Sequence, residues 1–214
     1  MIYLLSDLHG ELYPELLEYA SRARAGDLLI LLGDIGLAFD KSEENRRFTE
    51  EFLSLGINIA FIDGNHENFE YLNSFPTEVW NGGRVHRLTK NIVHLMRGEA
   101  YEIEGKSFFV FGGCSSSPKW REAGLWHEGD EPTAEQLGRA YECIEKNGRR
   151  FDYILTHKYT RVAPRPFESR ELEELLDFIN AHVEFSHWYS GHAHVDEQID
   201  EKHTRVYKSL ISLK

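Results

Sequence analysis

The sequence predicts an α/β fold, partly parallel and partly antiparallel, and three observations lead to this prediction. Short apolar runs alternate with helical patterns through residues 1–62, which is typical of parallel strands joined by helices. Closely spaced strand patterns with turn residues between them fill residues 84–111, which is typical of an antiparallel meander. Residues that bind metal ions close most of the apolar runs, where α/β proteins build their sites.

Residues 1–62 are expected to form a β-α-β-α-β unit. Pro14 suits the first turn of a helix, and Gly26 and Gly56 stand where helices should end. The elements expected are a strand at 2–5, a helix at about 13–25, a strand at 28–32, a helix at about 41–55 and a strand at 57–62.

The middle of the chain is expected to contain antiparallel strands followed by a long loop. Glu104-Gly105-Lys106 is the clearest hairpin turn between the strands. Residues 112–132 are rich in Gly, Ser and Pro, and we expect an irregular loop there, of the kind that is often functional. The strands expected before that loop are 84–88, 92–96, 100–103 and 107–111.

The C-terminal part returns to alternating helices and strands. Thr133 and Gln136 have the spacing of a capping box, which predicts that a helix begins at about residue 134. A polar loop is expected from His157 to Ser169. The elements expected are a helix at about 134–147, a strand at 153–156, an amphipathic helix at 170–181 and strands at 187–190, 195–199 and 205–211.

Length and composition fit one domain. The chain has 214 residues, of which 41% are hydrophobic, and this is enough for one sizeable core. No internal repeat, low-complexity tract or linker divides the sequence. We therefore expect a single domain over residues 1–214.

The charge and the cysteine content limit which partners and which cellular compartment are expected. A formal net charge of −12 repels phosphate backbones, so nucleic acid is not expected as the main partner, although a short phosphodiester stays compatible. Cys114 and Cys143 lack CxxC spacing and are too few for a disulfide framework, which favours a reducing compartment. No signal-peptide pattern and no apolar run of about 20 residues is found. We expect a cytoplasmic protein without a membrane partner.

Five short clusters of metal-binding residues are the most informative pattern in the chain. Besides His66 and Glu67, they offer three residues with carboxylate or amide oxygens and four imidazoles, enough to hold two divalent metal ions that share one bridging carboxylate. A dinuclear hydrolase is therefore the leading hypothesis. The clusters are Asp7-Leu8-His9, Gly33-Asp34, Gly64-Asn65-His66-Glu67, His157 and Gly191-His192-Ala193-His194.

Each cluster has an ordinary explanation when it is taken alone. Side chains two residues apart lie on the same side of an extended chain, but Asp-x-His and His-x-His also occur as surface dipeptides. Asp34 suits the N-cap of a helix, although Asp40 and Ser42 lie closer to where the next helix should begin. Gly64-Asn65 suits a tight turn. The metal hypothesis depends on the five clusters together.

In this order, the five clusters resemble the calcineurin-like metallophosphoesterase superfamily, and its small bacterial members in particular. The resemblance implies a sandwich of two mixed β-sheets flanked by helices. It also implies a catalytic role for His66, which would stabilise the transition state or protonate the leaving oxygen, with a structural histidine as the alternative. The metal ligands it implies are Asp7, His9, Asp34 and His194 for one ion and Asp34, Asn65, His157 and His192 for the other.

The sequence departs from the best-known branch of this superfamily. Protein Ser/Thr phosphatases continue the second cluster as Gly-Asp-x-x-Asp-Arg-Gly, whereas this chain continues Gly33-Asp34 with Ile-Gly-Leu-Ala-Phe. The acid that would orient His66 and the arginine that would grip phosphate are therefore absent from that motif. Asp40, Asp63 and Glu67 are candidates for the missing partner of His66, and Arg121, Lys119 and His127 are candidates for substrate contact. Core packing is expected for Trp120 and Trp126, rather than stacking on a base or an aryl group.

The expected function is hydrolysis of a phosphate monoester or diester by attack of a metal-bound hydroxide. The substrate is expected to be a phosphorylated small molecule or a nucleotide. Mn²⁺ is the ion that the resemblance implies, while ligands of this kind also admit iron, zinc or nickel. The alternatives are a non-catalytic interaction scaffold of the same fold, a phosphoprotein phosphatase, and a zinc hydrolase of the lactam or thioester type. The last would need a His-x-His-x-Asp-His cluster, which the sequence lacks.

Overall fold

The strand Leu28–Leu32 (β2) shows how the layers of the molecule are built. In the computed structural model, which describes residues 1–159 and 167–213, all five side chains of this strand are buried. Side chains alternate along a strand, so Leu28, Ile30 and Leu32 pack into one core while Leu29 and Leu31 pack into another. The strand therefore lies in a sheet that is covered on both faces.

The first sheet contains seven strands and holds the parallel part predicted from the sequence. β1, β2, β3 and β6 are neighbours that run parallel, and antiparallel strands complete both edges in the order β13-β1-β2-β3-β6-β5-β4. The bounds of its other strands are β1 Ile2–Leu5, β3 Asn58–Ile62, β4 Thr77–Trp80, β5 Gly83–Arg87, β6 Ile92–Leu95 and β13 Ile211–Ser212.

The second sheet contains six strands and is also mixed. β8, β9, β10 and β12 run parallel to their neighbours, and β7 and β11 are antiparallel edges in the order β11-β12-β10-β9-β8-β7. Its strands are β7 Glu99–Ile103, β8 Lys106–Phe111, β9 Arg150–Thr156, β10 Glu184–Ser190, β11 Glu197–Gln198 and β12 His203–Arg205.

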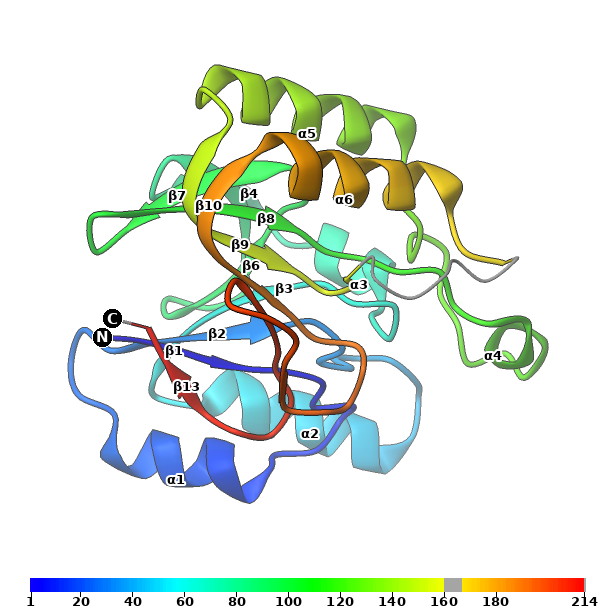
Figure 1. Ribbon diagram of the computed structural model, residues 1–214. Helices are drawn as coiled ribbons and strands as arrows, with labels where there is room; N and C mark the ends of the chain where they lie inside the picture. Colours follow the sequence, from blue (N-terminus) through cyan, green and yellow to red (C-terminus); the bar gives the residue numbers. More distant parts are fainter. Residues whose placement is uncertain (160–166, 214) are drawn as a thin grey trace.

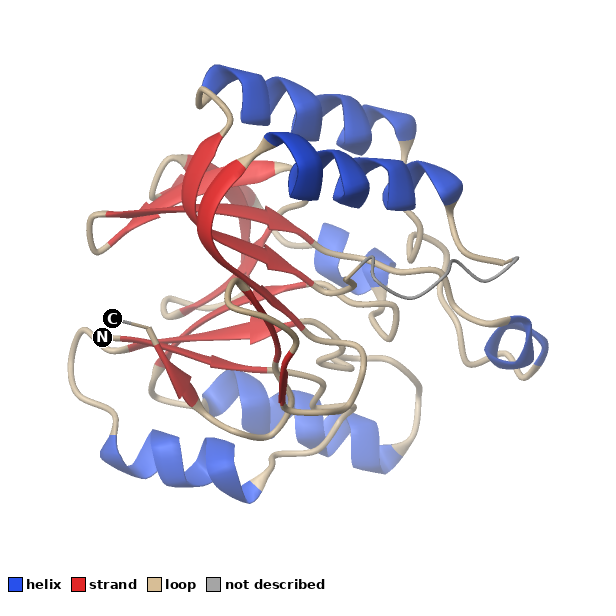
Figure 2. Cartoon of the chain, viewed as in Figure 1, coloured by secondary structure: helices blue, strands red, loops and turns tan. Residues whose placement is uncertain are grey.

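The two sheets pack face to face, and helices cover the outer face of each (Figures 1 and 2). One apolar cluster lies between the sheets, a second lies between the first sheet and helices α1 and α2, and a third lies between the second sheet and helices α5 and α6. This arrangement confirms the expected sandwich of two mixed sheets flanked by helices. The helices are α1 Pro14–Arg22, α2 Glu43–Ser54, α3 Phe69–Asn73, α4 Pro118–Glu122, α5 Ala134–Lys146 and α6 Arg170–His182.

Local signals in the sequence located several helix ends correctly. Pro14 is the first residue of α1, and the capping box of α5 is present because Thr133 and Gln136 each accept a backbone N–H from the other. Ser42 caps α2 by accepting the N–H of Asn45. Side chains that accept the first free N–H groups of a helix stabilise its N-terminus, and this chemistry is visible in the sequence alone.

The expected four-stranded meander at 84–111 was wrong in one respect. The two hairpins form, but β5 and β6 belong to the first sheet while β7 and β8 belong to the second. The chain crosses between the sheets at residues 96–98, where Gly98 has a φ of 75° and its α-carbon faces the backbone of Ala140 too closely for a side chain. The alternation of apolar and polar residues predicts that a segment is a strand, but it does not show to which sheet the strand belongs.

Other elements also differ from expectation. The strand expected at 205–211 is split, because β12 ends at Arg205 in one sheet and β13 begins at Ile211 in the other. Helices α3 and α4 and strand β4 were not predicted, and α4 lies inside the expected loop at 112–132. The loop expected between His157 and Ser169 lies largely outside the described residues. Among the described residues, no helix is long and apolar enough to cross a membrane.

Candidate metal centre

The candidate ligands lie where strands of both sheets end. In the first sheet they follow the neighbouring parallel strands β1, β2 and β3, and in the second sheet they follow the parallel neighbours β9 and β10. The carboxyl ends of parallel strands meet at one edge of a sheet, so clusters far apart in the sequence converge there. The residues brought to this edge are Asp7, His9, Asp34, Asn65 and His66 from the first sheet and His157, His192 and His194 from the second.

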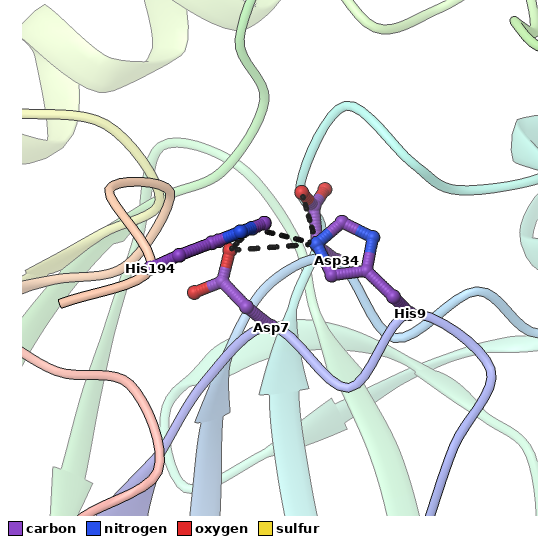
Figure 3. Close-up of side chains that lie close together, drawn as sticks. All are labelled: Asp7, His9, Asp34 and His194. Carbon is purple, nitrogen blue, oxygen red and sulfur yellow. Dashed lines mark hydrogen bonds and ion pairs between the residues drawn. The ribbon is translucent and has the colours of Figure 1, made fainter.

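One group of four side chains can hold a metal ion at this edge (Figure 3). Asp7, His9, Asp34 and His194 each offer a ligand atom, and all four atoms lie within 4.8 Å of one another. Nε2 of His9 lies 3.5 Å from Oδ2 of Asp34, and Nε2 of His194 lies 3.3 Å from Oδ1 of Asp7. These are the four residues that the family resemblance implies for one ion.

A second group shares Asp34 with the first. Asp34, His157 and His192 also offer atoms within 4.8 Å of one another. The two oxygens of Asp34 face different groups, because Oδ2 lies near His9 whereas Oδ1 lies 3.4 Å from Nε2 of His157. A carboxylate in this position can bridge two ions, as the sequence predicted for Asp34.

Two atoms at this edge of the sheets are suited to a cation because they are buried without a hydrogen-bond partner. They are Nε2 of His157 and Oδ1 of Asn65. The other ring nitrogen of His157, Nδ1, lies 2.8 Å from the carbonyl oxygen of Leu32, to which it can donate a hydrogen. Once Nε2 loses its proton, this contact leaves its lone pair for a metal ion, as histidine ligands of metal ions require. The amide nitrogen of Asn65 lies 3.4 Å from Oγ of Ser116, so its oxygen is free to face the same way.

The backbone at the ligands is held in an unfavourable conformation. Nine described residues other than glycine have a positive φ, and five of these are candidate ligands, with φ of 49–66°. Left-handed backbone is costly for such residues and gathers at functional sites, where surrounding structure imposes it. The five ligands are Asp7, His9, Asp34, His192 and His194.

Two glycines allow the loops to approach the ligands closely. A Cβ at Gly64 would stand 2.1 Å from Oδ1 of Asp34, and a Cβ at Gly191 would stand 2.1 Å from Oγ of Ser6 and 2.9 Å from Oδ2 of Asp7. Any other residue at either position would displace a ligand. The glycines of the sequence clusters are therefore required by the packing of the ligands themselves.

The charges of the centre are strongly coupled in the metal-free protein. Burial opposes ionisation of Asp34, but His157, His9 and His66 outweigh it and hold the pKa of Asp34 well below its ordinary value. Burial also opposes protonation of His157, yet the charge of Asp34 raises the pKa of His157 to about 10. Burial lowers the pKa of His192 to about 4, so this ring is neutral near neutral pH. A cation that binds His157 must displace the proton held there.

The side chain of His66 is surrounded by rings. Its ring centroid lies 5.0 Å from that of His9 and 5.6 Å from those of Phe39 and Trp120. Its backbone N–H donates to Oδ1 of Asp34 at 2.7 Å, which places the residue directly beside the shared carboxylate.

The three acids considered as partners of His66 have other contacts. Asp63 accepts hydrogen bonds from Arg97 and His94, Glu67 accepts from the backbone N–H groups of Ile35 and Gly36, and Asp40 accepts from that of Ser42. Among the described residues, no hydrogen bond joins any of the three to the imidazole of His66. Each of the three candidates therefore makes its described hydrogen bonds elsewhere in the fold.

Two buried acids connect loops around the candidate ligands through hydrogen bonds and an ion pair. Glu67 joins the turn after β3 to the turn after β2, and burial raises its pKa to about 8. Asp63 pairs with Arg97, whose guanidinium also donates to the carbonyl oxygen of Gly129 in the long loop. Glu67 could be found from its place in the third sequence cluster, whereas Asp63 and Arg97 meet only in the folded chain.

A cavity of about 520 Å³ opens beside the two ligand groups. This volume is within the usual range for small-molecule sites. Trp120 lines the cavity and belongs to none of the three apolar cores, so the expectation of core packing was wrong for it. The lining residues are His9, Asp34, Gly36, Phe39, Asp40, Asn45, Asn65, His66, Ser115, Ser117, Trp120, Leu125, Phe167, Glu168, His192 and His194.

The three candidates for substrate contact lie near this cavity but are not part of its lining. Arg121 donates to Glu131 at 2.7 Å and to the carbonyl of Ser116, and its guanidinium lies over the ring of Trp126. The ammonium of Lys119 lies 5.6 Å from the ring centroid of Trp120. Nε2 of His127 lies 2.6 Å from the carbonyl oxygen of Phe39. Their role in substrate contact stays a prediction.

Comparison with known proteins agrees with this geometry. A family model described as calcineurin-like phosphoesterase matches residues 1–196, a range that includes all the candidate ligands and His66. No curated protein matches the chain. Because the match covers most of the 214 residues, the chain belongs to the calcineurin-like phosphoesterase family.

Proposed function

We propose that this protein is a phosphoesterase that depends on two divalent metal ions and hydrolyses a phosphate monoester or diester of a small molecule or nucleotide. The observation that carries the proposal is the position of Asp34 between two ligand groups, with one oxygen toward each. The buried atoms of His157 and Asn65 that lack hydrogen-bond partners support it, because a cation would satisfy both.

The ligand set suits borderline divalent ions. Imidazole, carboxylate and amide ligands without thiolate accept Mn²⁺, which we propose as the native ion, and also iron, zinc or nickel. One ion would be held by Asp7, His9, Asp34 and His194, and the other by Asp34, Asn65, His157 and His192. Two such ions, when bound, lower the pKa of water and neutralise charge on the phosphate.

His66 is proposed as the general acid. Hydrolysis adds the oxygen of water to phosphorus and breaks the bond to the ester oxygen, which must then receive a proton. His66 lines the cavity and follows the candidate ligand Asn65 directly, which supports the proposal that its imidazole supplies that proton. Contacts with surrounding rings orient it, in place of a carboxylate.

The retained ligands weigh against a non-catalytic scaffold, which has no need of them. The segment after Asp34 weighs against a phosphoprotein phosphatase, because Ile35 and Leu37 are buried in the core and present no acid or arginine to the cavity.

The proposal is tested by loading the protein with Mn²⁺ and measuring bound metal and hydrolysis of aryl phosphates, nucleotides and cyclic nucleotides. We expect two ions per chain and measurable turnover. His66→Ala should lower kcat by about 10²- to 10⁴-fold while two ions stay bound, since general acid catalysis contributes about that much. Normal metal content without turnover on any substrate of the panel would contradict the proposal.

A further inference from the structure

The cavity beside the candidate metal centre has an apolar wall. Phe39, Trp120, Leu125 and Phe167 line it together with His66. None of the four belongs to the three apolar cores of the described structure. Part of their apolar surface therefore lines the cavity and does not pack between the sheets.

Two of these side chains are exposed although they are large and apolar. Trp120 is 38% exposed and Leu125 is 40% exposed. They come from the short helix α4 and the turn after it, where the N–H of Leu125 donates to the carbonyl of Trp120 at 3.0 Å. Exposed apolar side chains that gather in one place mark a binding surface, and here that surface opens onto the candidate metal centre.

The position of His66 relates this wall to the chemistry. The ring of Trp120 meets His66 edge to face, at 5.6 Å and 86°, and the ring of Phe39 lies 5.6 Å from His66 on a tilted plane. If His66 protonates the leaving oxygen, the group bonded to that oxygen must lie next to His66. The leaving group would then lie against Phe39 and Trp120.

The charges around the wall favour an uncharged leaving group. Asp40 lines the cavity, and so does Glu168, whose carboxylate pairs with Lys158 at 3.0 Å, and no Lys or Arg occurs in the lining formed by residues 1–159 and 167–213. The ammonium of Lys119 lies over Trp120 outside that lining, and Arg121 is paired with Asp130 and Glu131. A second anionic group on the leaving-group side would lie against carboxylates and aromatic rings. We therefore expect the leaving group to be uncharged and the phosphoryl group to be bound by the metal centre.

From these contacts we infer that Phe39 and Trp120 form a subsite for a flat, uncharged aromatic ring on the leaving-group side of the scissile bond. Aromatic rings gain from edge-to-face and offset contacts beyond the burial of their area, and both side chains line the cavity beside His66, where a substrate ring can contact them. The inference rests on the proposed phosphoesterase function. The ring can belong to an aryl alcohol or to a nucleoside, which share this chemistry.

The test compares substrates that have the same kind of scissile bond and differ in the ring. Benzyl phosphate is compared with n-butyl phosphate, and adenosine 5′-monophosphate with ribose 5-phosphate, using the full chain loaded with Mn²⁺. We expect kcat/KM to favour the ring-bearing member on the order of tenfold, since stacking of a base on an aromatic side chain contributes about 1–3 kcal/mol. The pair with the larger ratio shows which source of the ring is preferred.

Substitutions in the apolar wall test whether the wall causes the preference for substrates with a ring. Trp120→Ala and Phe39→Ala should each bring the ratio close to one, while Trp120→Phe should keep most of it. Trp126→Ala is the matched control, because Trp126 lies in the same loop, packs against Arg121 and does not line the cavity. It should leave the ratio unchanged.

Binding of phosphonates, which are not hydrolysed, keeps the subsite testable apart from catalysis. Calorimetry on the metal-loaded protein should show benzylphosphonate binding on the order of tenfold more tightly than n-butylphosphonate, with the difference lost in Trp120→Ala. Equal affinities, or a preference that survives both Trp120→Ala and Phe39→Ala, would overturn the subsite even if every ester is hydrolysed. Tighter benzylphosphonate binding without turnover of any ester would contradict the phosphoesterase function and leave the subsite standing.

Discussion

The two ligand groups share one carboxylate and differ in their surroundings. In the group of Asp7, His9, Asp34 and His194, the side chains of His9 and His194 are 28% and 47% exposed. In the group of Asp34 and His157, the corresponding exposures are 2% and 0%. The first group opens to the cavity and to solvent through its two histidines, whereas the second reaches the cavity through the half-buried His192 and keeps His157 fully buried. The same kinds of ligand should therefore contribute differently to metal exchange and to stability.

The largest effect is expected where the two groups meet. Asp34→Asn should lower kcat/KM about 10³-fold, because Asp34 belongs to both groups and metal ions supply several kcal/mol of charge stabilisation. Metal analysis of the purified variant should show fewer than two ions per chain. Asp177→Asn, an exposed position of α6, is the matched control and should behave as the wild type. A variant that retains two ions and full activity would remove Asp34 from its bridging position.

The contrast in burial is tested directly by comparing two histidines. In metal-free protein, His157→Ala should lower the free energy of unfolding by about 3 kcal/mol, because it removes a buried ring and leaves the charge of Asp34 without its partner. His194→Ala should cost less than about 1 kcal/mol, since its side chain is half exposed. Urea denaturation measures both values. Equal losses would mean that the two groups do not differ as the structure indicates.

Metal binding should stabilise the protein, and the ligand variants should lose different shares of that stabilisation. Free Mn²⁺ at 100 times its dissociation constant is expected to add about 2.7 kcal/mol to the free energy of unfolding for one site. Thermal denaturation with Mn²⁺ or with a chelator measures the change. His194→Ala should retain a shift from the buried group, whereas Asp34→Asn should lose most of it. A chelator without effect on wild-type protein that contains metal would contradict this expectation.

The smallest effect concerns a buried histidine outside the centre. Burial and, to a lesser extent, the neighbouring His94 lower the pKa of His86 to about 4. For the buried His157, in contrast, the charge of the neighbouring Asp34 raises the pKa. The contribution of neutral His86 to stability is present above pH 6.5 and is lost as the pH falls toward 4, because the unfolded chain binds the proton first. The pKa difference of about 2.5 corresponds to about 3 kcal/mol, and we expect a loss of about 2 kcal/mol in metal-free protein because solvent screens part of the interaction. This loss should shrink in His86→Gln, as urea denaturation at several pH values would show.

Much of the fold could be predicted because its signals are local. An apolar run such as 28–32 indicates a strand, and Pro14 and Thr133 indicate where helices begin. Each of these signals depends only on residues that are close together in the sequence. The change of sheet at residues 96–98 left no such signal, because alternation within a strand does not record which strand pairs with it. The split between β12 and β13 escaped prediction for the same reason.

The sequence by itself determined the ligand inventory, because clusters such as Gly64-Asn65-His66-Glu67 place their residues at strand ends by local geometry. Only the tertiary structure decided which atoms meet: that the two oxygens of Asp34 face different groups, that Asp63, Glu67 and Asp40 have other contacts, and that Phe39 and Trp120 surround His66. Phe39 and Trp120 are far apart in the chain, and a lone aromatic residue carries no sign of whether it packs in a core or lines a cavity. Metal chemistry depends on short motifs that a sequence displays, whereas substrate recognition depends on contacts between distant segments that only folding creates.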